Sequence, residues 1–243
     1  MNVLETIQSW VRRFGWDLVP FNPAQHPLLR RRSLIEHHGI DTVLDIGANA
    51  GQFGSELRNV VRYRGRIVSF EPSTSAFKQL QMAARGDKSW RVLNVALGDA
   101  PGIQRLHLAG NSESSSLLQM LPLHVEAAPY SRYTGEESIQ VEALDTVFDD
   151  VCKGARNIYM KIDTQGYEAQ VLRGAAHCLE RIDTVQIEMS LAPLYEGQAL
   201  FGELFANLSS GGYELIGVES NFGNARTGHL LQIDGIFHRE RAV

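Results

Sequence analysis

The residues best suited to chemistry lie in a short turn near residue 45. The stretch from Val43 to Gly54 is VLDIGANAGQFG, in which Asp45 closes an apolar run and glycines follow at 47 and 51. Glycines at such a turn let the backbone approach a ligand closely, beside the amides of a helix N-terminus. From this turn we predict a cofactor site formed by Asp45, Gly47, Ala48, Asn49 and Gly51.

The charges at this turn discriminate between two cofactors. A pyrophosphate-binding turn needs the pattern G-x-G-x-x-G, and here the second glycine position is Asn49. The negative charge of Asp45 would oppose a pyrophosphate, whereas it suits the ammonium group of an amino-acid moiety. The charges therefore favour S-adenosylmethionine, and a dinucleotide-dependent oxidoreductase remains the alternative.

A second acidic residue follows at the end of the next apolar run, in Phe70-Glu71-Pro72. Glu71 lies 20 residues beyond Gly51, a spacing at which an acid can accept hydrogen bonds from both ribose hydroxyls. The alternative is that its carboxylate caps a helix that starts at Ser73. Glu71 and Pro72 join the predicted cofactor site.

The third run ends in Asn94-Val-Ala96-Leu-Gly98. Its small side chains and backbone amides suit the lining of an adenine slot. Alone this signal is weak, but in step with the first two it adds Asn94 and Ala96 to the predicted site.

Residues for catalysis are predicted at the ends of two further apolar runs. Alternation along a strand points Lys161 and Asp163 to the same side, where donor and acceptor would meet. Glu188 ends another buried run and needs a partner or a function, and Lys161 is a plausible partner. We hypothesise that Asp163 accepts or orients a hydroxyl, while Lys161 and Glu188 hold it. A purely structural salt bridge is the alternative.

A histidine base and a divalent metal ion are the alternatives to this hypothesis. His124 and His229 are alternative bases, because a histidine titrates near neutral pH. Asp163 and Glu188 also offer hard oxygen ligands for a divalent metal ion. Two ligands do not make a site, so metal dependence is not favoured and no metal-binding residues are predicted.

The elements that must position these residues alternate between strands and helices from Asp41 onward. This alternation indicates an α/β fold with a parallel sheet and helices on both faces. The last two strands have no helical pattern between them, which predicts an antiparallel hairpin. The predicted strands cover 42–46, 66–70, 91–95, 157–162, 184–188, 213–218 and 230–238, and the predicted helices 51–61, 73–84, 167–173 and 200–209.

Two segments depart from the alternation. Residues 98–142 contain a serine cluster between extended runs at 103–108 and 138–142, and we interpret them as an inserted cap with a loop. Residues 1–40 form a predicted helical extension, with helices at 2–14 and 27–38, before a domain at 41–243. The first helix is amphipathic, so it packs on the domain, joins a second subunit in a homodimer, contacts a membrane surface or forms a lid over the substrate. The run Arg30 to Arg32 is expected on a solvated face.

Composition limits the class of protein. With 243 residues and 44% hydrophobic content, one sizeable core is expected. The net charge of −5 makes a nucleic-acid partner unexpected, because phosphate-backbone affinity comes from clustered Lys and Arg. The two cysteines form no framework or zinc motif, and no apolar run approaches the roughly 20 residues of a membrane span. A cytoplasmic location is expected.

Taken together, the strings DIGANAGQFG, FEP, NVALGD, KIDTQGYE and IE resemble the FkbM family of methyltransferases, over about Asp41 to Phe237. The resemblance implies a seven-stranded class I methyltransferase (Rossmann-like) fold with the last strand antiparallel. It also implies S-adenosylmethionine as donor and transfer usually to a hydroxyl, often on a sugar or polyketide. The stretch Ser114 to Leu117 is similar to a serine-rich stretch of that family. Many members carry Glu where this chain has Gln165.

The function expected from the sequence is therefore O-methyl transfer to a sugar, glycolipid or polyketide-type small molecule. Three alternatives stay open: a dinucleotide-dependent oxidoreductase, a methyltransferase of protein or nucleic acid, and a binding module that holds the cofactor without turnover. The acceptor itself is not predictable from the sequence, because substrate choice would lie in residues 98–142 and in the N-terminal helices.

Overall fold

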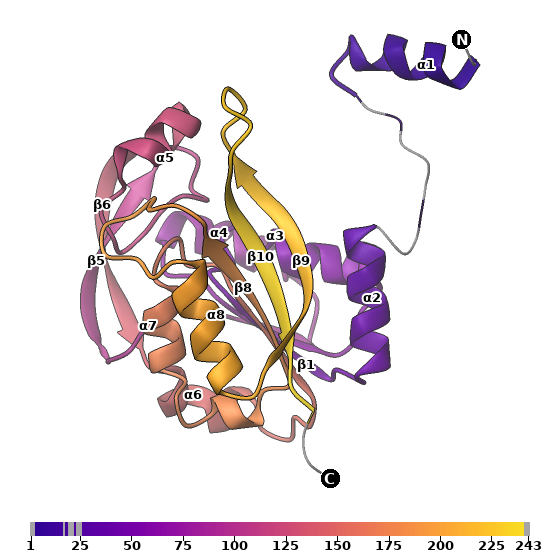
Figure 1. Ribbon diagram of the computed structural model, residues 1–243. Coiled ribbons are helices and arrows are strands. Elements are labelled where there is room, and N and C mark those ends of the chain that lie inside the picture. The colour runs from indigo at the N-terminus through magenta and orange to yellow at the C-terminus, as the bar shows by residue number, and fades with distance from the viewer. Residues whose placement is uncertain (1–2, 17, 19–21, 23–25, 241–243) are drawn as a thin grey trace.

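The computed structural model describes residues 3–16, 18, 22 and 26–240, with side chains from residue 6 onward (Figure 1). Its main sheet has the strand order β3-β2-β1-β7-β8-β10-β9. All neighbouring pairs are parallel except those of β10, which runs antiparallel to β8 and β9. The strands are β1 Thr42–Ile46, β2 Arg66–Phe70, β3 Trp90–Leu93, β7 Ile158–Ile162, β8 Thr184–Ser190, β9 Glu214–Gly223 and β10 Leu230–His238.

Helices cover both faces of this sheet, so its central strands are buried on both sides. Every residue of β1, β7 and β8 is buried, which explains their nearly continuous apolar and β-branched sequences. One core lies under α6 Leu144–Val151, α7 Glu168–Arg173 and α8 Phe201–Ser210. The other lies under α2 Pro27–His37, α3 Gln52–Glu56, the π-helical turn Leu57–Val61 and α4 Thr74–Ala83.

The predicted α/β architecture and the antiparallel hairpin are confirmed, with shifted boundaries. The expected helix at 51–61 is split, because α3 ends at Glu56 and a π-helical turn continues to Val61. Helix α6 was not expected from the sequence. Its buried residues Leu144, Phe148 and Val151 nevertheless have helical spacing, so a signal for this helix is present just after the cap.

The segment 98–142 forms a small sheet of its own, of strand order β4-β6-β5. Strand β5 (Gly102–Ala109) pairs antiparallel with β6 (Tyr133–Glu142), and β4 (Ala96–Leu97) pairs parallel with β6. Between β5 and β6 lie the serine loop, helix α5 (Pro122–Ala127) and a 3-10 turn at Pro129–Ser131. We call the segment from β5 to β6 the cap; it stands beside the main sheet in Figure 1.

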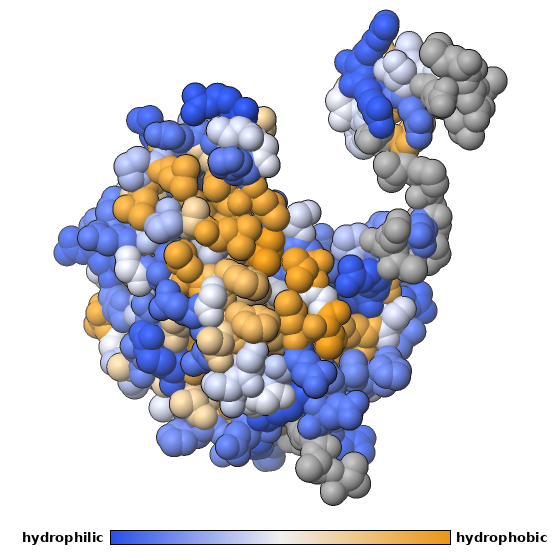
Figure 2. Space-filling view, in the orientation of Figure 1, coloured by the Kyte–Doolittle hydropathy of each residue, from blue (hydrophilic) through white to orange (hydrophobic). Residues whose placement is uncertain are grey.

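A separate apolar cluster attaches the cap to the rest of the chain. Met120 from the cap packs with Leu194, Tyr195 and Leu231, which belong to the chain after β8 and to β10. Figure 2 shows apolar side chains gathered on the visible face between α5 and the β9–β10 hairpin. The position of the cap is therefore fixed by side-chain packing as well as by the β4–β6 pairing.

The two N-terminal helices differ in their burial. Helix α2 packs on the sheet through Ile35, and Arg31 is also buried, at 5% exposure. The expectation of a solvated face was therefore wrong for Arg31, because its guanidinium pairs with Glu219 of β9. In α1 (Val3–Arg12) the apolar side chains of Ile7 and Trp10 are exposed, at 44% and 61%, and Val11 is half-buried. Within the described residues, no helix is long and apolar enough to cross a membrane.

Candidate active site

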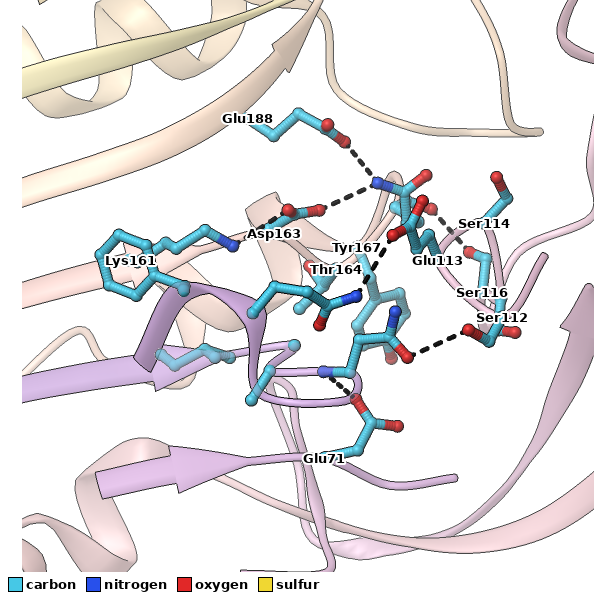
Figure 3. Close-up of a pocket in the computed structure, with 18 of the residues that line it drawn as sticks. Glu71, Ser112, Glu113, Ser114, Ser116, Lys161, Asp163, Thr164, Tyr167 and Glu188 are labelled. Carbon is cyan, nitrogen blue, oxygen red and sulfur yellow. Dashed lines mark hydrogen bonds and ion pairs between the residues drawn. The ribbon is translucent and has the colours of Figure 1, made fainter. Parts of the chain in front are cut away.

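A cavity of about 530 Å³ opens at the carboxyl ends of the central strands. Its walls come from the turn after β1, the ends of β2, β7 and β8, the serine loop of the cap and the β9–β10 hairpin. Ligands of open α/β sheets bind at this edge, outside the carboxyl ends of the strands. Figure 3 shows side chains from these elements converging on the cavity.

The turn after β1 has the backbone conformation that its glycines allow. Gly47 has φ +79° and Gly51 has φ +87°, in the left-handed region. A Cβ atom on Gly47 would lie 1.8 Å from the carbonyl oxygen of Asp163, so this position admits glycine alone. The amides of Gly47 and Ala48 donate to the carbonyl of Phe70, at 3.1 and 3.0 Å, which ties the turn to β2.

Glu71 lies at 7% exposure in the wall of the cavity and holds two loops together. One carboxylate oxygen accepts from the amide of Asn49 at 2.8 Å, and the other accepts from the amide of Ser73 at 2.8 Å. The capping interaction considered from the sequence is therefore present, alongside a link to the cofactor turn. Burial raises the pKa of Glu71 to about 7, although both amides oppose this shift.

The remaining predicted cofactor residues divide into two groups. Gly47, Ala48, Asn49, Glu71, Pro72 and Ala96 line the cavity, whereas Asp45, Gly51 and Asn94 are not part of its wall.

The three residues outside the wall contact residues of the neighbouring strands and helices. Asp45 is fully buried and accepts from the hydroxyl of Ser69 at 3.0 Å. A Cβ atom on Gly51 would lie 3.0 Å from Leu80 Cδ1 and 3.2 Å from Ala83 Cβ, so the backbone here packs closely against α4. The side-chain amide nitrogen of Asn94 donates to the backbone carbonyls of Glu71 and Pro72, at 2.9 Å each. Sequence position alone did not reveal that these three residues lie outside the cavity wall.

Two buried polar atoms at the turn have no hydrogen-bond partner among the described residues. They are Asp45 Oδ1 and Asn49 Nδ2. An unpaired buried polar atom costs about 1–3 kcal/mol, so a ligand that supplies partners is favoured there. Of the two residues, Asn49 lines the cavity, and its unpaired donor beside a glycine turn fits the carboxylate at the amino-acid end of S-adenosylmethionine.

The structure brings the three predicted catalytic residues to one end of the cavity. Lys161 Nζ lies 3.0 Å from Asp163 Oδ2, and Glu188 is adjacent on β8 (Figure 3). Burial lowers the pKa of Lys161, but the negative charges of Asp163 and Asp45 raise it by a larger amount. The pKa of Lys161 is therefore above its usual value. Burial, together with Asp163, raises the pKa of Glu188 well above its usual value.

Gln165 joins these carboxylates, a role that the sequence analysis did not assign. Its amide nitrogen donates to Asp163 Oδ1 at 2.9 Å and to Glu188 Oε2 at 2.8 Å. Its amide oxygen accepts from the hydroxyl of Tyr195 at 2.8 Å, and that hydroxyl lies 3.3 Å from His124 Nε2. The only signal in the sequence was the departure at position 165 from the Glu of many family members.

The two histidines considered as bases lie in different places. His124 borders the cavity, but it is buried, and burial lowers its pKa to about 4. It is therefore neutral near pH 7 and serves as a partner of Tyr195 and Ser131. His229 is exposed and does not line the cavity. Among the described residues, no group of three or more His, Cys, Asp or Glu is arranged to hold a metal ion.

The serine loop of the cap closes over the cofactor turn. Ser112 Oγ donates to Asn49 Oδ1 at 3.2 Å, and Ser116 Oγ donates to the carbonyl of Gln165 at 2.6 Å. Gln52 of α3 also donates to Glu113, at 3.2 Å. The cap therefore contacts both the predicted cofactor end and the predicted catalytic end of the cavity.

The sheet order, the single antiparallel strand β10 and a site at the carboxyl edge define a class I methyltransferase fold. The model of the methyltransferase FkbM domain matches residues 45–215, well over half of the sequence. The chain belongs to the FkbM methyltransferase family.

The chain is similar to two known proteins, one by sequence and one by structure. It is 26% identical over 167 residues to the 2-O-methyltransferase NoeI of Sinorhizobium fredii, a match that covers 64% of this chain and 66% of NoeI. It is also similar to the crystal structure of a methyltransferase FkbM from Methylobacillus flagellatus. That match has a TM-score of 0.51 and 15% identity, and it covers 81% of this chain and 43% of the other.

Proposed function

We propose that the chain is an S-adenosylmethionine-dependent O-methyltransferase that acts on a hydroxyl of a sugar, glycolipid or polyketide-type small molecule. The observation that carries this proposal is the Asp163 carboxylate, held by Lys161 and Gln165 at the same cavity as the cofactor turn. Family membership supports methyl transfer, and the similarity to NoeI, a 2-O-methyltransferase, supports an oxygen acceptor.

The cofactor half of the cavity is assigned to the turn after β1 and the end of β2. S-adenosylmethionine, when bound, supplies an activated methyl carbon. Asn49 offers an unpaired amide nitrogen, and Glu71 offers carboxylate lone pairs for ribose hydroxyls. Ala96 and Pro72 leave room for a flat ring because their side chains are small or compact.

Asp163 is the proposed general base. A sugar hydroxyl is barely acidic, so removal of its proton during methyl transfer benefits from a positioned base. Each oxygen of Asp163 already accepts one hydrogen bond, from Lys161 or from Gln165, and each keeps a lone pair for the acceptor hydroxyl. Lys161 and Gln165 thus orient the carboxylate, and Glu188 holds Gln165 from the other side.

The proposal is tested by two measurements on the full chain. Calorimetric titration with S-adenosylmethionine and with NAD(H) distinguishes a methyltransferase from an oxidoreductase. Mass spectrometry then compares glycolipids and secondary metabolites from cells with and without the protein. We expect binding of S-adenosylmethionine and a gain of one methyl group on a hydroxyl of one such compound.

Other outcomes would assign the alternatives. Binding of NAD(H) instead of S-adenosylmethionine would indicate an oxidoreductase. Binding of S-adenosylmethionine without any methylated product would indicate a module that holds the cofactor without turnover. A methyl group found on protein or nucleic acid would contradict the proposed acceptor class.

A further inference from the structure

One half of the cavity has a floor of polar side chains, on a sheet face that also carries apolar core residues. Under α2 and α3 this face carries Val43, Ile67 and Tyr159, which belong to the buried core. Toward the hairpin the same face becomes polar. The backbone register pairs Lys161 with Gln186, Glu188 with Asp234 and Asp234 with Glu219, so these residues share one face and line the cavity together.

The floor is a preorganised hydrogen-bond network. Gln186 accepts from the hydroxyl of Tyr159 and donates to Asp234, at 2.6 Å in both cases. Asn221 donates to Glu188 at 2.7 Å and to Asp234 at 3.2 Å. The carboxyl groups of Glu188 and Asp234 are therefore held in place by side-chain amides. Their remaining lone pairs are oriented before a ligand binds.

Arg31 of α2 and Glu219 of β9 form the far wall. Their nitrogen and oxygen lie 2.8 Å apart, with side-chain exposures of 6% and 13%. Arg31 Nε and Glu219 Oε1 are nevertheless buried without a hydrogen-bond partner among the described residues. The pair therefore presents one unused donor and one unused acceptor, a combination that a hydroxyl group can satisfy because it both donates and accepts.

The charged side chains in this half of the cavity disfavour the binding of an anionic ligand. Its lining includes the acidic side chains of Glu56, Asp163 and Glu219, together with Glu188 and Asp234, whose pKa values are raised by burial, against two cations, Lys161 and Arg31. Each cation is already paired with a carboxylate. A phosphate or carboxylate group on the ligand would be attracted by Arg31 but repelled by several acidic side chains at close range.

We propose that this polar floor and the Arg31–Glu219 pair form a subsite for an uncharged, polyhydroxylated group, such as the ring of a sugar without phosphate or carboxylate. The subsite rests on the proposed function in one respect, because it places one ring hydroxyl at Asp163. It narrows the acceptor class to neutral saccharides and gives the N-terminal extension, through Arg31, a part in substrate selection.

The test measures binding directly, so it does not depend on turnover. Saturation-transfer NMR is recorded on the full chain with S-adenosylhomocysteine. The probes are the methyl glycosides of the common hexoses and N-acetylhexosamines, compared with hexose 6-phosphates and hexuronic acids. We expect at least one neutral glycoside to bind, and each charged sugar to bind at least about tenfold more weakly than its neutral counterpart.

Variants test the assigned residues through charge selectivity, which a purely structural role would not change. Glu219→Gln removes one repulsive charge and is expected to reduce the preference for neutral sugars at least about tenfold. Because Glu219 also holds Arg31, the measurement is repeated with Asp234→Asn, which leaves that pair intact and should shift selectivity in the same direction. Glu214→Gln, an exposed change on the same strand, is the matched control and should leave selectivity unchanged.

Two results would overturn the subsite: charged sugars that bind as tightly as neutral ones, or no glycoside binding up to about 100 mM. Failure of the proposed function is a different result. Neutral glycosides that bind without ever being methylated would uphold the subsite and contradict the methyltransferase. Methylation of a phosphorylated or carboxylated acceptor would uphold the methyltransferase and contradict the subsite.

Discussion

At the scale of single residues, Glu71 gives the site a dependence on pH. Its pKa is raised to about 7 by burial, and it is proposed to accept hydrogen bonds from the cofactor ribose. A protonated carboxyl group loses an acceptor, so the ionised form binds the cofactor more tightly. The affinity should therefore approach its maximum about one pH unit above this pKa and fall as the pH decreases through it, by up to about tenfold per pH unit.

Calorimetric titration with S-adenosylhomocysteine from about pH 6 to about pH 8 measures this dependence. Glu168 also has a pKa raised to about 7 by burial, so a variant must assign the titration. Glu71→Gln should bind more weakly at the upper pH and show a flat profile. A Glu71→Gln profile as steep as that of the wild type would remove Glu71 from this role.

The residues that sequence predicted best are those fixed by backbone geometry. Gly47 could be assigned to the turn because a glycine at a strand–helix junction has a recognisable spacing. The position of Asp45 behind the cavity wall was not predictable, because it involves a contact with Ser69 of the neighbouring strand. Gln165, Glu219 and Arg31 were missed, because what makes them functional candidates is contact between residues far apart in the sequence.

At the scale of elements, strands and helices with a clear period were predictable, and the cap was predictable only in outline. The flanking extended runs do pair, but β6 begins at Tyr133, earlier than the run expected from residue 138. Its first half is largely exposed, so it lacks the apolar alternation that reveals a strand. The hydrogen bonds between the serine loop and the cofactor turn have no sequence pattern at all.

Among the serine-loop residues of the cap, Ser116 is the one whose substitution should lower the free energy of unfolding most clearly. Its hydroxyl donates to the carbonyl of Gln165 and accepts from the amide of Leu118, and it is 1% exposed. Ser116→Ala leaves both groups without this partner and should lower the free energy of unfolding by about 1–3 kcal/mol. Urea denaturation measures the change, with exposed Ser209→Ala as the control. A loss below about 0.5 kcal/mol would show that the hydroxyl does not connect the two loops.

At the scale of the whole molecule, α1 is the part whose role is least determined by the fold. Its exposed side chains include Ile7 and Trp10, at 44% and 61%, and Phe14, just after the helix, is 65% exposed. The expectation that this helix packs on the domain therefore has no support in the burial of these three side chains. Contact with a membrane surface and pairing with a second copy remain the predictions for this helix.

The double variant Trp10→Ser, Phe14→Ser separates these roles from packing on the domain. Because both side chains are exposed, the free energy of unfolding should stay within about 0.5 kcal/mol of the wild type. Sedimentation with anionic lipid vesicles and sedimentation velocity without lipid should show weakened membrane binding or weakened self-association. A larger loss of stability, with both kinds of association unchanged, would show that α1 packs on the domain.

The most direct test of the account is the turnover of Asp163→Asn on the acceptor identified by mass spectrometry. This change keeps the size of the side chain but removes the proposed base, so methyl transfer should fall about 10²- to 10⁴-fold. Calorimetry with S-adenosylhomocysteine should give an unchanged affinity, because Asp163 lies at the acceptor end of the cavity. Near-normal turnover of Asp163→Asn, with the cofactor bound, would contradict the assignment of Asp163 as the base.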